Sequence, residues 1–193
     1  MRPTRSSACS IVGLLLCAGL LLVGCTAAAT TAPTPPSPIG AEATGSDTVA
    51  IYATVIRRLC TRDDSFGGTY NPAIVYLVRR TNDAAGDPRA PRGVPAPLSE
   101  AVQNGISAAL DDLPGRIVWV DSPDDAPKDA MGAVEGHGVI VTLGSISPQE
   151  DGSVHVPASI YMASLAAAGQ TYVLQQQGGA WVVTGNTGVQ WMS

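Results

Sequence analysis

Basic charge is scarce in this 193-residue chain. It carries 11 Lys and Arg residues against 16 Asp and Glu residues, a net charge of −5 at neutral pH, and Lys128 is the only lysine. Nucleic-acid-binding domains concentrate basic residues to contact phosphates, and polybasic segments hold proteins on anionic lipid. The composition therefore argues against a nucleic-acid partner and against electrostatic attachment to a membrane.

Cysteine and histidine are also few. The chain has four cysteines, and two of them, Cys9 and Cys17, lie in an apolar N-terminal segment, which leaves Cys25 and Cys60. One thiol in the folded part of the chain cannot form an internal disulfide, so the domain has to be stable through its hydrophobic core alone. The two histidines do not have the spacing of paired zinc ligands.

Familiar catalytic and cofactor-binding motifs are missing too. No serine lies in the G-x-S-x-G pattern of a hydrolase, and there is no glycine-rich loop of the phosphate-binding type. The acidic residues between Ser122 and Gly136 do not follow the order of a calcium-binding EF-hand loop, so a solvated loop is favoured there. The sequence predicts neither a metal site nor a cofactor.

The N-terminal segment has the features of an export signal. Two arginines precede an apolar run, Ile11–Val23, that is shorter than the ~20 residues of a membrane span. The run ends in Leu22-Val23-Gly24-Cys25, which resembles the lipobox of bacterial lipoproteins. The resemblance implies that residues 1–24 form a signal peptide that is removed. It also implies that Cys25 carries a diacylglycerol and can carry an N-acyl group such as palmitate.

Lipidation at Cys25 would place the mature protein at the cell membrane, on its outer, extracytoplasmic side. Each buried methylene contributes ~0.8 kcal/mol, so one acyl chain anchors marginally and two or three hold firmly. With residues 1–24 removed, nine basic residues remain against 16 acidic ones, and the acyl chains have to supply the attachment. The alternative is a plain secretory signal that leaves Cys25 as an unmodified thiol.

Residues 25–46 are predicted to be a lipidated cysteine followed by a disordered tether. From Thr26 to Pro38 the chain contains only Ala, Thr, Ser and Pro, which cannot bury enough apolar surface to fold. Such segments are extended, semi-rigid spacers; recognition of the Pro-rich stretch by a partner domain is the alternative. Residues 47–193 are predicted to form a single globular domain, an ordinary length for one.

Two amphipathic helices are predicted early in this domain. Ser46 or Asp47 can cap the first, whose apolar residues recur at three- and four-residue spacing between residues 49 and 59. Cys60, beside this stripe, is expected to be a buried and inert thiol. The second helix follows Ser99 as N-cap. Asp112 lies in its last turn, where the helix dipole disfavours an acid and suggests a basic neighbour such as Arg116.

Strands are predicted over residues 74–78, 116–121 and 138–144, separated by loops, of which residues 81–97 are expected to be exposed. An antiparallel meander is predicted to follow. It includes strand around residues 154–162, an ambiguous run at 165–168 assigned to strand, and two strands, 171–177 and 180–184, joined at Gly178-Gly179. A last strand is predicted around residues 189–191.

The predicted fold class is α+β, with two N-terminal helices packed on one face of a curved, mostly antiparallel sheet that ends in a meander. The closing strands resemble those of the nuclear-transport-factor-two-like superfamily, an α+β roll shared with ketosteroid isomerase; they are Tyr172-Val173-Leu174, Trp181-Val182-Val183 and Val189-Gln190-Trp191. That fold usually has more helix before its first strand, so a cystatin-like sheet wrapped around one helix is the alternative. The roll implies a concave face that relatives use for catalysis, ligand binding or protein contacts.

Acid–base candidates are limited to Asp63 and Asp64 after the first helix, His137 between two glycines, and His155 on a strand. Adjacent aspartates usually point in different directions and are solvated, and a histidine is often half-buried without a catalytic role. A non-enzymatic binding or assembly module displayed at the cell envelope is therefore favoured, with an unknown protein or small-molecule partner. The alternative is a small-molecule enzyme of the roll type that uses these residues as acid and base in an apolar pocket.

A pocket would distinguish the two functions. The enzyme requires a cavity into which one of the four candidate side chains points. It would be ruled out if Trp119, Tyr161 and Trp181 filled the concave face of the sheet.

Overall fold

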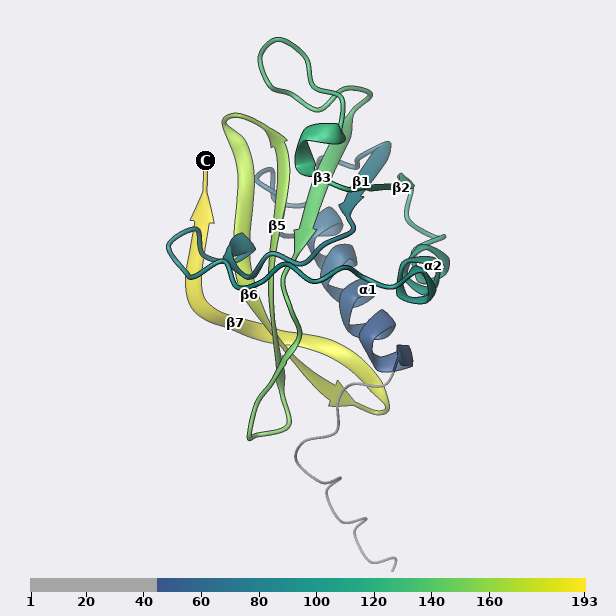
Figure 1. Ribbon diagram of the computed structural model, residues 1–193, viewed down its shortest axis with the longest axis vertical. Helices are drawn as coiled ribbons and strands as arrows, with labels where there is room; N and C mark the ends of the chain where they lie inside the picture. The colour runs from purple at the N-terminus through teal and green to yellow at the C-terminus, as the bar shows by residue number, and fades with distance from the viewer. Residues whose placement is uncertain (1–44) are drawn as a thin grey trace, which may run out of the picture. The chain divides into compact units, whose positions relative to one another are not determined.

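The computed structural model describes residues 45–193, which contain two α-helices and one seven-stranded sheet (Figure 1). The helices are α1 (Gly45–Thr61) and α2 (Glu100–Ala109). The predicted signal peptide, Cys25 and nearly all of the predicted tether lie outside the described residues. Within residues 45–193, neither helix is long and apolar enough to cross a membrane.

The sheet joins a parallel part to an antiparallel meander. Its strands are β1 (Ile74–Val78), β2 (Arg116–Val120), β3 (Gly138–Leu143), β4 (Ser147–Pro148), β5 (Val154–Ala163), β6 (Ala166–Gln177) and β7 (Ala180–Met192). The order is β2-β1-β3-β5-β6-β7, and β4 pairs with β5. β1 pairs in parallel with β2 and β3, and all the other pairings are antiparallel.

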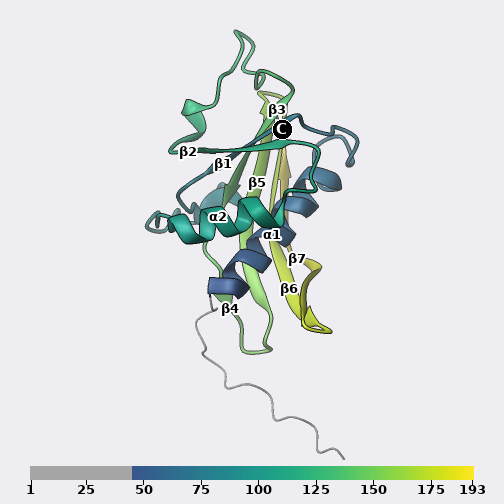
Figure 2. The same cartoon turned by 90° about the vertical axis from the view of Figure 1, so that its right-hand side faces the viewer.

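Both helices lie on the same face of this sheet (Figure 2). The apolar stripe of α1 faces the strands, and Ile51, Val55 and Ile56 are completely buried. α2 is shorter and buries mainly Ile106. The predicted α+β class is confirmed, with α2 following β1 in the chain.

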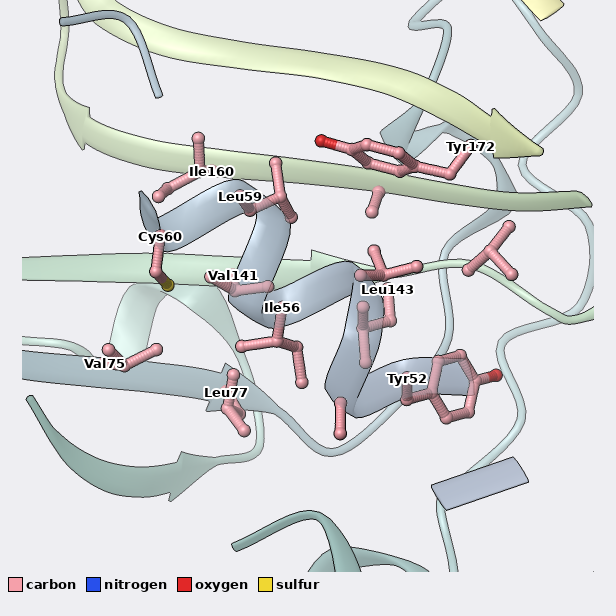
Figure 3. Close-up of a cluster of buried hydrophobic side chains, with 14 of the residues drawn as sticks. Tyr52, Ile56, Leu59, Cys60, Val75, Leu77, Val141, Leu143, Ile160 and Tyr172 are labelled. Carbon is pink, nitrogen blue, oxygen red and sulfur yellow. The ribbon is translucent and has the colours of Figure 1, made fainter. Parts of the chain in front are cut away.

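Alternate residues of the long strands supply the other half of the core. β5 buries every second residue from Val154 to Met162, as expected for a strand with one face against a helix. Figure 3 shows side chains of α1, including Ile56 and Leu59, lying among those of the strands, with Tyr172 of β6 at one side of the cluster. β6 and β7 bend along their length (Figure 1), so the sheet curves around the core.

Two loop segments cover the opposite face of the sheet. In the loop that follows β2, which contains the short 3-10 helix Pro123–Asp125, Ala126 and Val134 pack against a second small core. The other segment, residues 79–97, crosses β5 and β6 (Figure 1) and contains the 3-10 helix Asp83–Ala85. Residues 81–97 were expected to be an exposed loop; Ala84 and Ala85 are buried, whereas most of residues 88–97 are exposed.

The 79–97 segment can lie close to β6 because Gly169 of that strand has no side chain. A Cβ placed on Gly169 of β6 would lie 2.4 Å from the Ala85 carbonyl oxygen and 2.3 Å from Nε1 of Trp191. That indole nitrogen donates a hydrogen bond to the same carbonyl at 3.0 Å. The segment is therefore fixed to β7 by a hydrogen bond that passes over a glycine.

Several predicted boundaries change in the structure. α1 begins at Gly45, so Ser46 and Asp47 lie in its first turn and do not precede it as caps. Ser99 does cap α2, because its side chain accepts from the Val102 amide. Ala166 begins a new strand antiparallel to β5, and Leu165 lies exposed in the turn between them.

The C-terminal meander is confirmed, with one difference. Gly178 and Gly179 form the turn between β6 and β7, at φ angles of 60° and 85°. The two short strands predicted after this turn are one continuous strand, β7. Its pairing with β6 shifts register at two places, between Gln170 and Tyr172 and between Val173 and Leu174, and such irregularities bend a strand.

The basic partner of Asp112 is Arg57 of α1, in place of the predicted Arg116. Two guanidinium nitrogens of Arg57 donate to the two Asp112 carboxylate oxygens at 2.6 and 2.8 Å, and one of them also donates to the Ala109 carbonyl at 2.9 Å. Hydrogen bonding from Arg57 lowers the pKa of Asp112. The pair joins the C-terminal part of α1 to the turn that follows α2, since α2 ends at Ala109 and Asp112 lies beyond it.

Shortening a buried side chain of α1 should destabilise the domain. Ile56→Ala removes a fully buried side chain and should lower the free energy of unfolding by about 2–5 kcal/mol, because a cavity remains beside the sheet. Urea unfolding followed by circular dichroism measures the change. Leu165→Ala is the matched control, since Leu165 is 88% exposed; equal losses in the two variants would contradict this description of the core.

Candidate ligand-binding site

A cleft of about 310 Å³ opens between the C-terminal end of α1 and the strands β6 and β7. α1 ends at Thr61 and the chain turns away through Asp63 and Asp64, while β7 curves along the other side. Residues of all three elements line the cleft, and the polar side chains among them are Arg58, Asp63, Asp64, Gln170, Thr184, Asn186 and Gln190. The cleft thus lies on the helix-bearing face, at the edge of the main core.

Four of these side chains form a continuous hydrogen-bonded chain. Nε of Arg58 donates to Oδ2 of Asp63 at 2.8 Å, and Nε2 of Gln170 donates to the same oxygen at 3.0 Å. Nε2 of Gln190 donates to Oε1 of Gln170 at 2.9 Å. The chain connects α1, the loop after it, β6 and β7, so all four side chains are held in defined orientations.

The same chain leaves hydrogen-bonding capacity unused. Within the described residues, the terminal nitrogens of Arg58 and Oδ1 of Asp63 have no hydrogen-bond partner. The ion pair is partly open to solvent, with side-chain exposures of 38% for Arg58 and 20% for Asp63. Gln170 and Gln190 each retain a second amide hydrogen. These groups are available to a molecule in the cleft.

Tyr172 lines the cleft from the side of the core. The residue is completely buried, and its hydroxyl makes no hydrogen bond within residues 45–193. Figure 3 shows this hydroxyl directed along the sheet toward the Leu59 end of α1. Burial raises the pKa of Tyr172, the nearby Gln170 side chain acts in the opposite direction, and the Asp63 carboxylate raises the pKa further. Most buried polar groups are hydrogen-bonded, and an unsatisfied one costs about 1–3 kcal/mol; within residues 45–193 the Tyr172 hydroxyl and Oγ of Ser65 are the buried side-chain oxygens without a partner.

Of the predicted acid–base candidates, Asp63 and Asp64 line the cleft, but their carboxylates have different roles. Oδ1 of Asp64 accepts hydrogen bonds from the amides of Phe66 and Gly68 at 2.9 and 2.6 Å, and Oδ2 accepts from the Tyr70 amide at 3.4 Å. Asp64 therefore shapes the turn after α1. Asp63 is the carboxylate that faces the polar chain.

Neither histidine lies in the cleft. The ring of His137 stacks on Tyr70 with 4.2 Å between ring centroids, and its Nε2 lies 2.8 Å from the Tyr70 carbonyl oxygen. His155 is on β5, opposite Val173 of β6 and Ser147 of β4. The structure does not bring Asp63 together with either imidazole.

None of the three large aromatic residues that could have filled the concave face lines the cleft, although Trp119 and Trp181 pack against the main core. Nε1 of Trp119 donates to Oγ of Ser107 at 2.9 Å, and the Tyr161 hydroxyl donates to the Gly132 carbonyl at 2.8 Å. Trp181 donates to Asp47 at 3.1 Å, at the start of α1. The cleft is left open.

Sequence reasoning missed Arg58, Gln170, Tyr172 and Gln190 as site residues. One signal was present in the strand pattern. Ala168, Gln170, Tyr172 and Leu174 occupy alternate positions of β6, and three of them are buried apolar or aromatic residues on the core face. A glutamine at an inward position of such a strand indicates either a polar partner or a ligand.

Cys60 is buried in the core, as expected from its place beside the α1 stripe. Burial raises the pKa of its thiol to about 12, and the charge of Asp64 contributes in the same direction. Because the thiolate is the reactive form, the thiol is inert at neutral pH. In the described part of the chain, no group of three or more potential metal ligands is placed to hold an ion.

Comparisons of the chain with models of known families, with curated proteins and with solved structures found no match. The site is therefore interpreted from its own geometry.

Stability should fall as the pH rises from 9 to 12. The Cys60 thiol, ordinarily ionised near pH 9, has a folded-state pKa of about 12, so above pH 9 the unfolded chain ionises and the folded one does not. The stabilisation from the neutral thiol is fully present below pH 9. Between pH 9 and pH 12 the free energy of unfolding should fall by roughly 1 kcal/mol per pH unit. Urea unfolding under reducing conditions measures it.

The Cys60→Ala variant distinguishes the contribution of Cys60 to the loss of stability at high pH from the contribution of Tyr52. Burial raises the pKa of Tyr52 from 10.0 to about 12, so the variant should begin to lose stability near pH 10 instead of pH 9. An unchanged pH profile in Cys60→Ala would contradict the assignment.

Proposed function

We propose that this protein is a lipid-anchored lipoprotein of the cell envelope whose domain binds a small molecule in the cleft between α1 and β7. The observation that carries the proposal is the chain of Arg58, Asp63, Gln170 and Gln190, which holds unused donors and acceptors around one opening. Orienting polar groups at the edge of an apolar core are characteristic of ligand sites. A pocket on a concave sheet is also what the predicted α+β roll implies.

Binding without chemical conversion fits this geometry better than acid–base catalysis. A general base needs a carboxylate or imidazole that is free to take a proton from the substrate. Among residues 45–193, Oδ1 of Asp63 is free, but the carboxylate is held in an ion pair with Arg58. Neither His137 nor His155 is among the lining residues to act with it as a second acid–base group. The proposed enzyme of the roll type has the weaker support.

The anchoring part of the proposal rests on the lipobox-like sequence Leu22-Val23-Gly24-Cys25. Cys25 would carry the lipid on the extracytoplasmic side of the membrane. The stretch rich in Ala, Thr and Pro that follows it would separate the domain from the bilayer. The binding cleft would then sample molecules in the space next to the membrane.

Replacement of the predicted lipidated cysteine should release the protein from membranes. In Cys25→Ala, no thiol remains for acylation, and the protein should move from the membrane fraction to the soluble fraction or accumulate as an unprocessed precursor. Fractionation with immunoblotting, together with metabolic labelling by a palmitate analogue, measures this. Cys60→Ala is the matched control and should keep both label and membrane association. Full membrane retention and labelling of Cys25→Ala would refute lipidation at this residue.

A bulky side chain at the mouth of the cleft should block ligand binding. Met192 lines the cleft and is 77% exposed, so Met192→Trp adds volume there without entering the core. Ligand-observed NMR with a chemically diverse library of small molecules identifies binders of the full-length protein. Their signals should be lost in Met192→Trp. They should persist in Val189→Trp, a matched change on β7 outside the cleft. Absence of any binder that is sensitive to Met192→Trp would overturn the proposed binding function.

A further inference from the structure

We infer that the ligand of this cleft is an uncharged, polyhydroxylated molecule about as large as one sugar ring, a class that includes monosaccharides and cyclic polyols. The inference rests on the proposed function and narrows it to one ligand chemistry. Three features support it: the balance of charge in the cleft, the kinds of hydrogen-bonding groups that line it, and its size.

The charges in the cleft disfavour an ionic ligand. Arg58 and Asp63 neutralise each other at 2.8 Å, so neither is available as an isolated counter-ion. Asp64 also lines the cleft, and its carboxylate accepts hydrogen bonds from three backbone amides. An anion would meet both carboxylates, whereas a cation would meet the Arg58 guanidinium and a carboxylate that already has two donors.

Donors and acceptors alternate in the cleft. Arg58 can only donate and the Asp63 carboxylate can only accept, whereas the amides of Gln170 and Gln190 do both. A hydroxyl group also donates and accepts at one atom. Adjacent hydroxyl groups of one ligand can therefore satisfy Arg58 and Asp63 at the same time, which a purely accepting or purely donating ligand cannot do.

The Tyr172 hydroxyl is the third kind of group at the site. The side chains of Gln170 and Asp63 are close enough to it to affect its pKa. Rotation of the Gln170 side chain away from Asp63, breaking a 3.0 Å hydrogen bond, would expose it to the ligand. A ligand hydroxyl can then take the place of Gln170 on Asp63 and give Tyr172 the partner that it lacks in this structure.

The size of the cleft restricts the ligand further. Its volume of about 310 Å³ is at the lower end of the ~300–1,000 Å³ of small-molecule sites. One ring with its hydroxyl groups fits this space, whereas a chain of several rings exceeds it.

The inference is tested with full-length protein purified in a detergent that has no sugar headgroup. The probes are myo-inositol, D-glucose, acetate and methylammonium. Polyols stabilise most proteins because they are excluded from the surface, so binding is measured by saturation-transfer NMR on the probe and not by thermal stability. At least one of the two polyols should show saturable binding, and the two ions should show none.

Three variants assign that binding to the cleft. Asp63→Asn removes the charged acceptor and should weaken polyol binding by roughly tenfold or more. Tyr172→Phe keeps the ring and should weaken it by about fivefold. In Tyr172→Phe the unliganded protein should be at least as stable as the parent, because the lost hydroxyl has no partner within residues 45–193. Tyr52→Phe is the matched control: its hydroxyl donates to the Gly144 carbonyl at 3.0 Å, outside the cleft, and polyol binding should be unchanged.

The possible failures are distinguishable. Saturable binding of acetate or methylammonium in place of the polyols, abolished by Met192→Trp, would overturn the ligand class and leave the proposed binding function standing. Polyol binding that is equal in the parent, Asp63→Asn and Tyr172→Phe would overturn the assignment to this cleft. If none of the four probes binds, the ligand class is wrong, and the library experiment decides whether the binding function is wrong as well.

Discussion

The packing of α1 against the curved sheet is the contact on which the rest of the structure depends. Burial of a large aliphatic side chain contributes about 1.5–3 kcal/mol, and α1 places Ile51, Ile56 and Leu59 almost completely out of solvent. Cys60, the one cysteine in the described residues, is unpaired, so no disulfide supports this contact there. The same helix sets the position of the cleft, because the cleft opens where α1 ends and β7 bends around it.

The fold was largely predictable because its signals are local. Apolar spacing of three and four residues identified both helices, and the turn at Gly178-Gly179 identified the hairpin of β6 and β7. The loop predicted over residues 81–97 is exposed over most of residues 88–97, but Ala84 and Ala85 are buried, which was not predicted because the composition is that of a loop. Their burial comes from contacts with distant strands, among them the hydrogen bond from Trp191 to Ala85, 106 residues apart. No local pattern contains that information.

The site was predicted only in part, for the same reason. Asp63 was singled out as an acid beside a helix end, but its partner Gln170 is 107 residues away in the chain. Asp64, the direct neighbour of Asp63, is directed to backbone amides because the turn after α1 needs an acceptor there. His137 and His155 lie outside the cleft, since each belongs to a strand or loop that faces another part of the molecule. The residue types in the sequence identified possible acids and bases, but the topology of the fold determines which of them lie close together.

The end of β7 makes contacts with two separate parts of the protein within three consecutive residues. Gln190, Trp191 and Met192 all line the cleft. Gln190 also donates to Gln170 of β6, whereas the indole of Trp191 donates to the Ala85 carbonyl and holds the 79–97 segment. Because neighbouring side chains of a strand point to opposite faces, this short stretch of β7 contributes both to the cleft and to the covering of the other face of the sheet.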